Sequence, residues 1–503
     1  MPSDIPLSLE ALRLDAKRLH RAFEAGQPAA IQRLKQHPPR RSGDLKRADF
    51  LHVIALENGF ESWPRLKAAA ETMGLDRAQA LQRLKIALAH GQVAIVARLL
   101  DRFPDLAQGL FGLECALYDI DAVRRTLARD PAQAVTLRGP RSPMAHLCFS
   151  RWFKGPGDEA DMLAVAEALV AAGASVNDGI AHGPHRLSVL YGAVAADNMA
   201  LVRWLLAHGA DPNDGESLYH STELGHLGGL RLLLEAGAAP AGTNALLRAM
   251  DFNDHAAVEL LLAHGAQVDD FNPAEVGGQA PVVCPALHQA ARRGCDARMA
   301  ALILGGVDVN RRWQGVTAYE LARVHGNAAI AAAIADAGGD TALSDAVVPL
   351  VDAVEGRTGR YIDPARVPDA LSTLLREMMP HADRLPHMQR LVAAGLPYDH
   401  PDAEGITPLH AAGWEGLPEV LAWVMALRPD MSHVNIYGGT LLTTILHGAE
   451  NCPQRDERDH ATCLDLVLQH GVALPRGSAD QVGRDDLRAI LTEWAADHPG
   501  QVV

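Results

Sequence analysis

Two groups of histidine and cysteine residues in this sequence could bind a metal ion. His182 and His185 stand three positions apart in AHGPH, and Cys452, His460 and Cys463 lie within NCPQRDERDHATC. Imidazole and thiolate groups bind Zn²⁺, but a structural zinc site needs four such ligands. Neither segment supplies four, and loop positions for the histidines and core packing for Cys463 are simpler interpretations. The sequence therefore predicts no metal and no cofactor.

Motifs of the common enzyme classes are not found in this sequence. It has no GxSxG, no P-loop, no HExxH and no GxGxxG preceded by a strand. Acid and base catalysis would need two carboxylates close together in a groove, and sequence alone does not define that distance. We therefore expect a protein that is not an enzyme. The alternative is an enzyme, such as a metal-dependent hydrolase, with its site in long loops.

A short string that recurs along the chain indicates how these residues are positioned. Residues 407–412 read TPLHAA, and PALHQAARRG at 285–294 keeps the Leu, His and Ala-Ala positions. More degenerate copies lie near Leu190, Leu218, Leu246 and Tyr319. Thr caps a helix, Pro fits the first helical turn, and Leu with Ala lets helices stack closely. Each copy therefore predicts the start of a helix.

Glycines at a fixed offset after each copy mark the end of a second helix. They are Gly173, Gly209, Gly237, Gly265, Gly305 or Gly306, Gly395 and Gly471. The residue just past a helix end often has a positive φ, which glycine adopts without strain. Together with the recurring string, this pattern resembles ankyrin repeats of the bacterial type, whose period is about 33 residues. The resemblance covers about 160–340 and about 385–475.

This resemblance implies an all-α fold, an ankyrin-repeat solenoid of stacked helix-turn-helix units with a divergent helical N-terminal cap. We expect the cap over 1–75 and the repeat array over 76–340, with divergent repeats to about 160. An irregular bend or linker is expected over 341–384, followed by C-terminal ankyrin-like repeats and a cap over 385–503. The segment 269–285, DDFNPAEVGGQAPVVCP, predicts a long exposed loop.

Composition agrees with stacked helices and predicts a cytoplasmic protein. The 503 residues are 48% hydrophobic but only 5% aromatic, so the core must consist mainly of Ala, Leu and Val. No apolar run approaches the ~20 residues that cross a membrane. Six cysteines without a CxxC pair are typical of reduced thiols.

Net charge predicts the kind of partner. The chain carries a net charge of −15, although residues 1–100 hold 16 Lys and Arg against 10 Asp and Glu. An acidic body repels nucleic acid and anionic membranes and attracts a partner with a basic patch. The basic segment KQHPPRRSGDLKR is either a contact for an acidic partner or a solvated loop. We expect a monomer that binds another protein.

In the ankyrin family, ligands are usually proteins, held by the loop tips and by the variable, inward-facing positions of the first helix. The match to TPLHxAAxxG implies that the first-helix positions are His220, Glu223, Arg248, Asp251, Phe252, Gln289, Arg292, Arg293, Trp414 and Glu415. At the expected loop tips lie Arg311, Arg312, Trp313 and Tyr437. Aromatic residues and arginine are the usual anchors of protein interfaces. Alternatively, Trp313 folds back onto a neighbouring repeat, and Phe252 and Trp414 fill space between repeats.

The sequence therefore predicts a non-catalytic protein-binding scaffold that uses the concave face and the loop tips of a solenoid. An inhibitor, an immunity factor, a regulator of an enzyme and an effector all remain open as its role.

Overall fold

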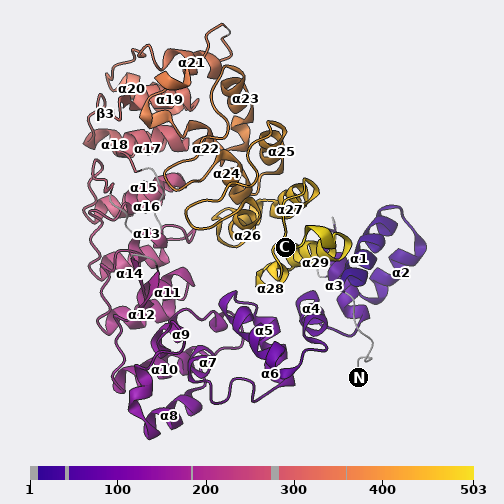
Figure 1. Cartoon of the computed structure of the whole chain (residues 1–503). Coiled ribbons are helices and arrows are strands. Elements are labelled where there is room, and N and C mark those ends of the chain that lie inside the picture. Colours follow the sequence, from indigo (N-terminus) through magenta and orange to yellow (C-terminus); the bar gives the residue numbers. More distant parts are fainter. Residues whose placement is uncertain (1–8, 40–44, 183–184, 274–282, 358) are drawn as a thin grey trace. The chain divides into compact units, whose positions relative to one another are not determined.

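Nearly all of the regular secondary structure in the described residues is helical (Figure 1). The structure is a computed structural model and describes all residues except 1–8, 40–44, 183–184, 274–282 and 358. It divides into two compact units, Met1–Ala181 and His182–Val503. The all-α prediction is confirmed. The boundaries expected near 75, 340 and 384 remain predictions, and most of the expected long loop at 269–285 lies outside the described residues.

The first unit is a succession of helices in which near neighbours along the chain pack together. Its elements are α1 (Leu9–Glu24), α2 (Pro28–Gln36), α3 (Arg47–Glu57), α4 (Trp63–Thr72), α5 (Arg77–Ala89), α6 (Val93–Arg102), α7 (Phe111–Ala116), α8 (Ile120–Arg129), η1 (Pro131–Ala134), α9 (Pro143–Cys148), η2 (Trp152–Lys154) and α10 (Glu159–Ala171). Helices α1 to α4 bury Leu19, Phe50, Ile54 and Leu66 in one hydrophobic core. Between the helices, Arg33 donates hydrogen bonds to Asp15 and Glu57.

The second unit begins with five helix pairs, and each pair packs on the next. Strand β1 (Gly179–His182) spans the boundary between the two units, and β2 (His185–Ser188) follows it. The pairs are α11 (Val189–Ala195) with α12 (Met199–Ala207), α13 (Ser217–Ser221) with α14 (Gly228–Glu235), α15 (Ala245–Asp251) with α16 (His255–Ala263), α17 (Ala286–Arg293) with α18 (Ala297–Ile303), and α19 (Ala318–Val324) with α20 (Ala328–Asp336). The first helix of each pair contacts the first helix of the next pair, and the second helices do the same. Consecutive helix pairs therefore stack in register.

The rest of the second unit, the orange and yellow ribbon in Figure 1, continues this stacking. It contains η3 (Leu304–Gly306), β3 (Arg312–Trp313), β4 (Val316–Thr317), α21 (Val348–Val354), η4 (Pro364–Arg366), η5 (Asp369–Leu371), α22 (Leu374–Met378), η6 (Ala382–Arg384), α23 (Leu385–Ala393), α24 (Pro408–Glu415), α25 (Pro418–Ala426), α26 (Leu441–Asn451), η7 (Arg455–Glu457), α27 (His460–Gln469), α28 (Ser478–Gln481), α29 (Asp485–Asp497) and η8 (Pro499–Gln501). The segment 341–384, expected to be a bend or linker, thus holds short helices, and α22 packs on α24.

The helix starts follow from the recurring string. At α24, the hydroxyl oxygen of Thr407 accepts a hydrogen bond from the N–H of His410, and Pro408 occupies the first turn. Leu409 is 1% exposed, as a core position requires. Ser188 and Thr317 cap α11 and α19 in the same way. A side-chain oxygen at this position satisfies a backbone N–H that has no partner within the helix.

Most of the predicted helix-ending glycines have the expected backbone conformation. Positive φ values occur at Gly173, Gly209, Gly237, Gly265, Gly395 and Gly471. The prediction for Gly305 or Gly306 is wrong, because α18 runs on into the 3-10 turn η3 and neither residue has a positive φ. At that repeat the tighter turn ends the helix without a left-handed residue.

Replacing Leu409 by Ala tests the repeat register. We expect the free energy of unfolding in urea to fall by about 2 to 5 kcal/mol, because a buried leucine leaves a cavity. Leu137, which is 62% exposed, provides the control: Leu137→Ala should change stability by less than about 0.5 kcal/mol. Equal stability of the two variants would contradict the core position of Leu409.

Candidate functional site

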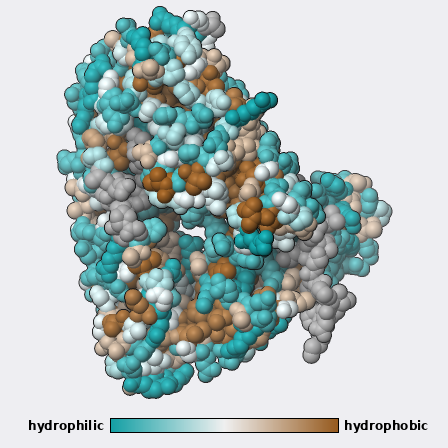
Figure 2. Space-filling view, viewed as in Figure 1, coloured by the Kyte–Doolittle hydropathy of each residue, from teal (hydrophilic) through white to brown (hydrophobic). Residues whose placement is uncertain are grey.

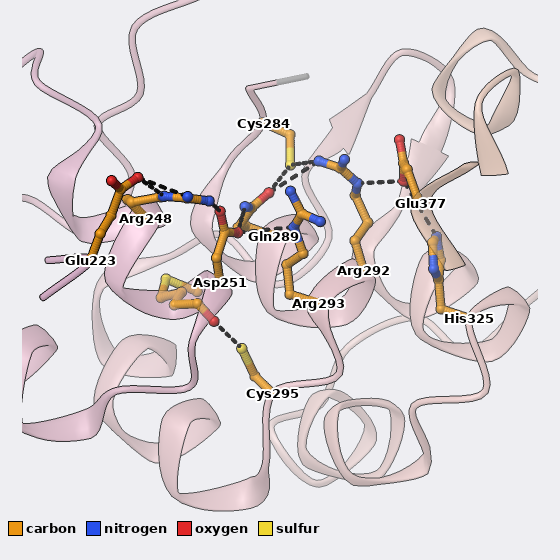
Figure 3. Close-up of polar contacts among 11 residues, drawn as sticks. Glu223, Arg248, Asp251, Cys284, Gln289, Arg292, Arg293, Cys295, His325 and Glu377 are labelled. Atoms are coloured by element: carbon orange, nitrogen blue, oxygen red, sulfur yellow. Dashed lines mark hydrogen bonds and ion pairs between the residues drawn. The ribbon is translucent and has the colours of Figure 1, made fainter. Parts of the chain in front are cut away.

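In the second compact unit, a row of polar side chains connects successive helix pairs (Figure 3). It consists of Glu223, Arg248, Asp251, Gln289, Arg292 and Glu377, and we call it the polar chain. The Arg248 guanidinium donates to Glu223 over 2.8 Å and to Asp251 over 2.9 Å. The amide of Gln289 also donates to Asp251. Arg292 then links Gln289, at 3.0 Å, to Glu377, at 2.7 Å.

Repeat geometry explains why these groups meet. Residues three apart share one face of a helix, so Arg248 and Asp251 on α15 point the same way. Stacking in register then sets that face beside the corresponding face of α17, which carries Gln289 and Arg292. Opposite charges in neighbouring repeats therefore pair within the fold.

The pair Arg292–Glu377 is the most buried part of the polar chain. The two side chains are 1% and 2% exposed and stand 85 positions apart in the sequence. Thr373 donates a further hydrogen bond to Glu377 over 2.8 Å. Burial by itself would raise the pKa of Glu377, but the charge of Arg292 outweighs burial and the pKa falls to about 2. Burial lowers the pKa of the neighbouring His325 to about 3, so that imidazole is neutral.

This burial corrects two predicted site residues. Gln289 and Arg292 are 3% and 2% exposed, so neither offers the surface that a direct contact with a partner needs. The prediction failed because a repeat pattern says nothing about what covers the inward-facing positions. Here Arg292 pairs with Glu377 on α22, from a segment without the repeat consensus, and Gln289 bonds to Asp251 and Arg292.

His220 lies between two carboxylates. Its Nδ1 atom is 2.9 Å from Glu223, and its Nε2 atom is 3.3 Å from Glu216. Burial by itself would lower the pKa of His220, but the hydrogen bonds and charges of the two carboxylates raise it to about 9. The imidazole is therefore protonated at neutral pH, and both nitrogens are engaged within the fold.

The predicted loop-tip residues before α19 make contacts within the fold. Arg311 pairs with Asp269 at 2.7 Å and lies over the ring of Phe271. Arg312 is exposed and donates to the carbonyl of Gly315. The half-buried Trp313 meets the ring of His288 edge-on, with centroids 6.2 Å apart, so it folds back onto the preceding repeat.

A cavity of about 930 Å³ collects half of the predicted site residues. Those that line it are Arg248, Asp251, Phe252, Arg293, Trp414, Glu415 and Tyr437. They come from α15 and α17 on one side and from α24 and the loop before α26 on the other. Phe252 and Trp414 are half-buried and border this space. Residues far apart in the sequence therefore share one site.

Sequence reasoning missed several residues of this cavity. Arg376, His381 and Arg458 line it, and so do Glu404, His447 and Cys452. Arg376 and His381 belong to the segment 341–384, and Arg458 precedes α27, so no repeat register could identify them. A charged pair among the leucines and methionines of LSTLLREMM was the one available signal for Arg376.

Two hydrogen-bonded loops form one rim of the cavity. We call residues 402–406 and 433–439 the rim loops. The N–H of Ile436 donates to the carbonyl of Glu404 over 3.0 Å, and the Tyr437 hydroxyl donates to the Glu404 carboxylate over 2.8 Å. The side chain of Asn435 accepts from the N–H groups of Tyr437 and Gly439. These bonds fix the loops before any ligand arrives.

The cysteines of the chain are structural in this arrangement. All six lie in the described part and are buried free thiols. Burial raises the pKa of Cys452, beside the cavity, to about 11, and its sulfur lies 3.8 Å from Glu415. A thiol with this pKa is protonated at neutral pH and is a weak nucleophile.

Metal ligands and membrane spans were sought among the described residues. No group of three or more His, Cys, Asp or Glu there could hold a metal ion. His182 is exposed, and the His185 side chain lies outside what the structure describes. None of the helices described is long and apolar enough to cross a membrane.

Replacing Glu377 by Gln tests the buried pair. We expect a loss of about 3 to 5 kcal/mol in the free energy of unfolding, because Arg292 stays buried without a counter-charge. The control is Glu259→Gln, which breaks an exposed pair with Arg298 and should cost less than about 1 kcal/mol. If both variants unfold at the same urea concentration, the pair does not hold α22 in place.

Replacing His220 by Gln tests its two carboxylate partners through pH. The folded pKa of about 9 exceeds the ordinary value of 6.5, so the stabilisation is complete below pH 6.5 and disappears as pH rises through 9. The difference in unfolding free energy between wild type and variant should therefore shrink by about 3 kcal/mol from pH 6 to pH 10. A difference that does not change over this range would contradict the assignment.

Comparison with known proteins identifies the repeat. A family model for ankyrin repeats, in three copies, matches residues 190–272, which hold α12 to α16 and most of α11. No curated protein matches the sequence. Ankyrin repeats are in general a protein-interaction module. The helix pairs, their stacking and this match together show that residues 190–272 form ankyrin repeats.

Proposed function

We propose that this chain is a non-catalytic scaffold that binds one partner protein at the cavity between α15, α17, α24 and α26. The observation that carries the proposal is the convergence of Phe252, Trp414 and Tyr437 with four charged predicted residues on one cavity. Large aromatic side chains beside arginine are typical of the residues that dominate protein interfaces. A cavity of about 930 Å³ has room for several side chains of a partner segment.

The rim loops extend the proposed contact surface. Val434, Ile436 and Tyr437 are each at least half exposed, although they are large hydrophobic residues. Most of the surface in Figure 2 is hydrophilic, and hydrophobic side chains form small groups. Because hydrogen bonds already fix these loops, a partner would pay little entropy to order them. An exposed apolar group on a rigid support favours protein binding.

The internal pairing of the charges supports a binding role over a catalytic one. Asp251 accepts from Arg248 and Gln289 and pairs with Arg293, and Glu377 pairs with Arg292. Burial raises the pKa of Glu415, but the neighbouring Cys452 is a protonated thiol rather than a nucleophile. These groups hold one another in position, which suits a rigid surface.

The acidic net charge of −15 supports a partner with a basic patch, attracted at long range. Buried free thiols and the bacterial-type repeat pattern support a cytoplasmic protein of bacterial origin, which we propose to be a monomer. Inhibitor, immunity factor, regulator and effector roles all use the same contact surface.

Capture of the native partner tests the proposal. The tagged full chain is used to isolate proteins from its host, and the protein retained is purified and titrated by calorimetry. Replacing Trp414 or Tyr437 by Ala should raise the Kd by about thirtyfold or more, since an anchor of this kind contributes 2 kcal/mol or more.

Tyr361 supplies a matched control. Tyr361 and Tyr437 are 71% and 68% exposed, but Tyr361 does not line the cavity. Tyr361→Ala should leave the Kd unchanged, and circular dichroism should show that all variants are folded. If the Trp414 and Tyr437 variants bind the partner as tightly as wild type, the contact surface lies elsewhere.

A further inference from the structure

Four arginines line the cavity: Arg248, Arg293, Arg376 and Arg458. Each lies close to a carboxylate, and in two of these pairs the carboxylate side chain is more buried than the arginine. The side chain of Arg293 is 16% exposed against 7% for Asp251, and that of Arg376 is 14% exposed against 1% for Asp402. The guanidinium groups, rather than the carboxylates behind them, therefore form the accessible surface of these pairs.

Several arginine N–H groups at this cavity lack an acceptor. The Nε atoms of Arg293, Arg376 and Arg458 are buried and make no hydrogen bond with any residue that the structure describes. Arg293 Nε is 2.9 Å from Asp251 and Arg376 Nε is 3.2 Å from Asp402, but neither N–H points along the contact. Arg458 stands 3.8 Å from Glu415, beyond hydrogen-bond distance. A buried donor without an acceptor is costly.

Three of the carboxylates that line the cavity already have partners. Asp251 is shared by Arg248, Arg293 and Gln289, and Glu404 accepts from the Tyr437 hydroxyl. Glu377 pairs with the buried Arg292 behind the wall. Asp383 and Glu415 also line the cavity. The acceptors of the first three carboxylates are used within the fold, and the Nε groups of Arg293 and Arg376 beside them are left without an acceptor among the described residues.

The local potential agrees with this inventory. Burial and the positive charges of Arg293, Arg384 and Arg458 lower the pKa of His381, a residue of the cavity wall. Burial raises the pKa of Glu415, and the positive charges of Arg458 and Arg293 act in the opposite direction. The charges of Arg293 and Arg458 thus act on both groups of the wall.

We propose that the cavity binds an acidic side chain, Asp or Glu, from a segment of the partner protein. This inference rests on the proposed function and adds the chemistry of the bound group. A carboxylate accepts several N–H groups at once and matches the planar fork of arginine. Trp414, Phe252 and the rim loops would pack against apolar residues that flank the acidic one. The basic patch proposed for the partner and this acidic residue act at different ranges: the patch steers approach, and the acidic residue fits the cavity.

Short peptides test the proposal on the full chain. The probe is the acetylated and amidated peptide Glu-Glu-Leu-Glu-Glu, compared by calorimetry with peptides in which Gln or Lys replaces every Glu. We expect the acidic peptide to bind about tenfold tighter than the Gln peptide, because charge-assisted hydrogen bonds are worth 1.5 to 3 kcal/mol. Stronger binding of the Lys peptide, or equal binding of all three, would overturn the proposal.

Arg293→Gln and Arg458→Gln locate the binding in the cavity. The first variant leaves Asp251 with Arg248 and Gln289 as partners, so the fold should persist, and the second changes a different wall. Each should weaken the acidic peptide about tenfold. The control, Arg298→Gln, removes an arginine on α18 that is 62% exposed and does not line the cavity, and it should bind as wild type does. Equal losses in all three variants would place the binding elsewhere and overturn the proposal.

Free glutamate and inorganic phosphate serve as further probes. If either binds as tightly as the peptide and with the same dependence on Arg293, the ligand is a small anion and the inference of a protein segment is wrong. Failure here is distinguishable from failure of the proposed function. If Trp414→Ala abolishes partner capture but no acidic probe binds, the proposed function is supported and the proposal of an acidic side chain is wrong. If acidic peptides bind but the chain captures no partner, the scaffold proposal falls instead.

Discussion

The buried ion pair between Arg292 and Glu377 is the interaction on which the cavity depends. It fastens α22, from a segment without the repeat pattern, to α17 in the repeat array. Helix α22 also packs on α24, whose Trp414 and Glu415 form the facing wall. A buried pair of this kind is costly to break, because the remaining charge stays desolvated. The pair thus holds together two parts of the second unit that repeat stacking alone would not join across the cavity.

The polar chain shows how a repeat protein can build a rigid site from charged residues. Along it, Arg248, Asp251 and Gln289 satisfy one another through hydrogen bonds. Side chains fixed in this way lose little entropy when a ligand binds. Because these acceptors are used internally, arginine N–H groups such as the Nε groups of Arg293 and Arg376 are left without an acceptor in the part of the chain that the structure describes. Internal satisfaction of the charges and selection for an anionic ligand therefore have the same origin.

Electrostatics acts on two length scales in this protein. The net charge of −15 produces a negative field around the whole chain, which salt screens within about 8 Å at physiological ionic strength. Inside the cavity, arginines such as Arg293 and Arg376 dominate the short range. A partner that is basic overall and carries an acidic anchor would meet both conditions. Ankyrin repeats supply the rigid support, and the rim loops supply apolar contact next to it.

The sequence by itself determined the local structure, because helix caps and helix ends depend on near neighbours. Thr407 and Pro408 specify the start of α24, and Gly209 specifies the end of α12, through interactions within one turn. At Gly306 the same reasoning failed, since a 3-10 turn is an equally local alternative. The sequence also indicated inward-facing positions, of which Arg293 and Trp414 reach the cavity. Only the tertiary structure decided which of these are covered. Arg292 is buried because Glu377, 85 positions away, meets it. Contacts at such a separation depend on the path of the chain through 341–384, which no repeat period encodes.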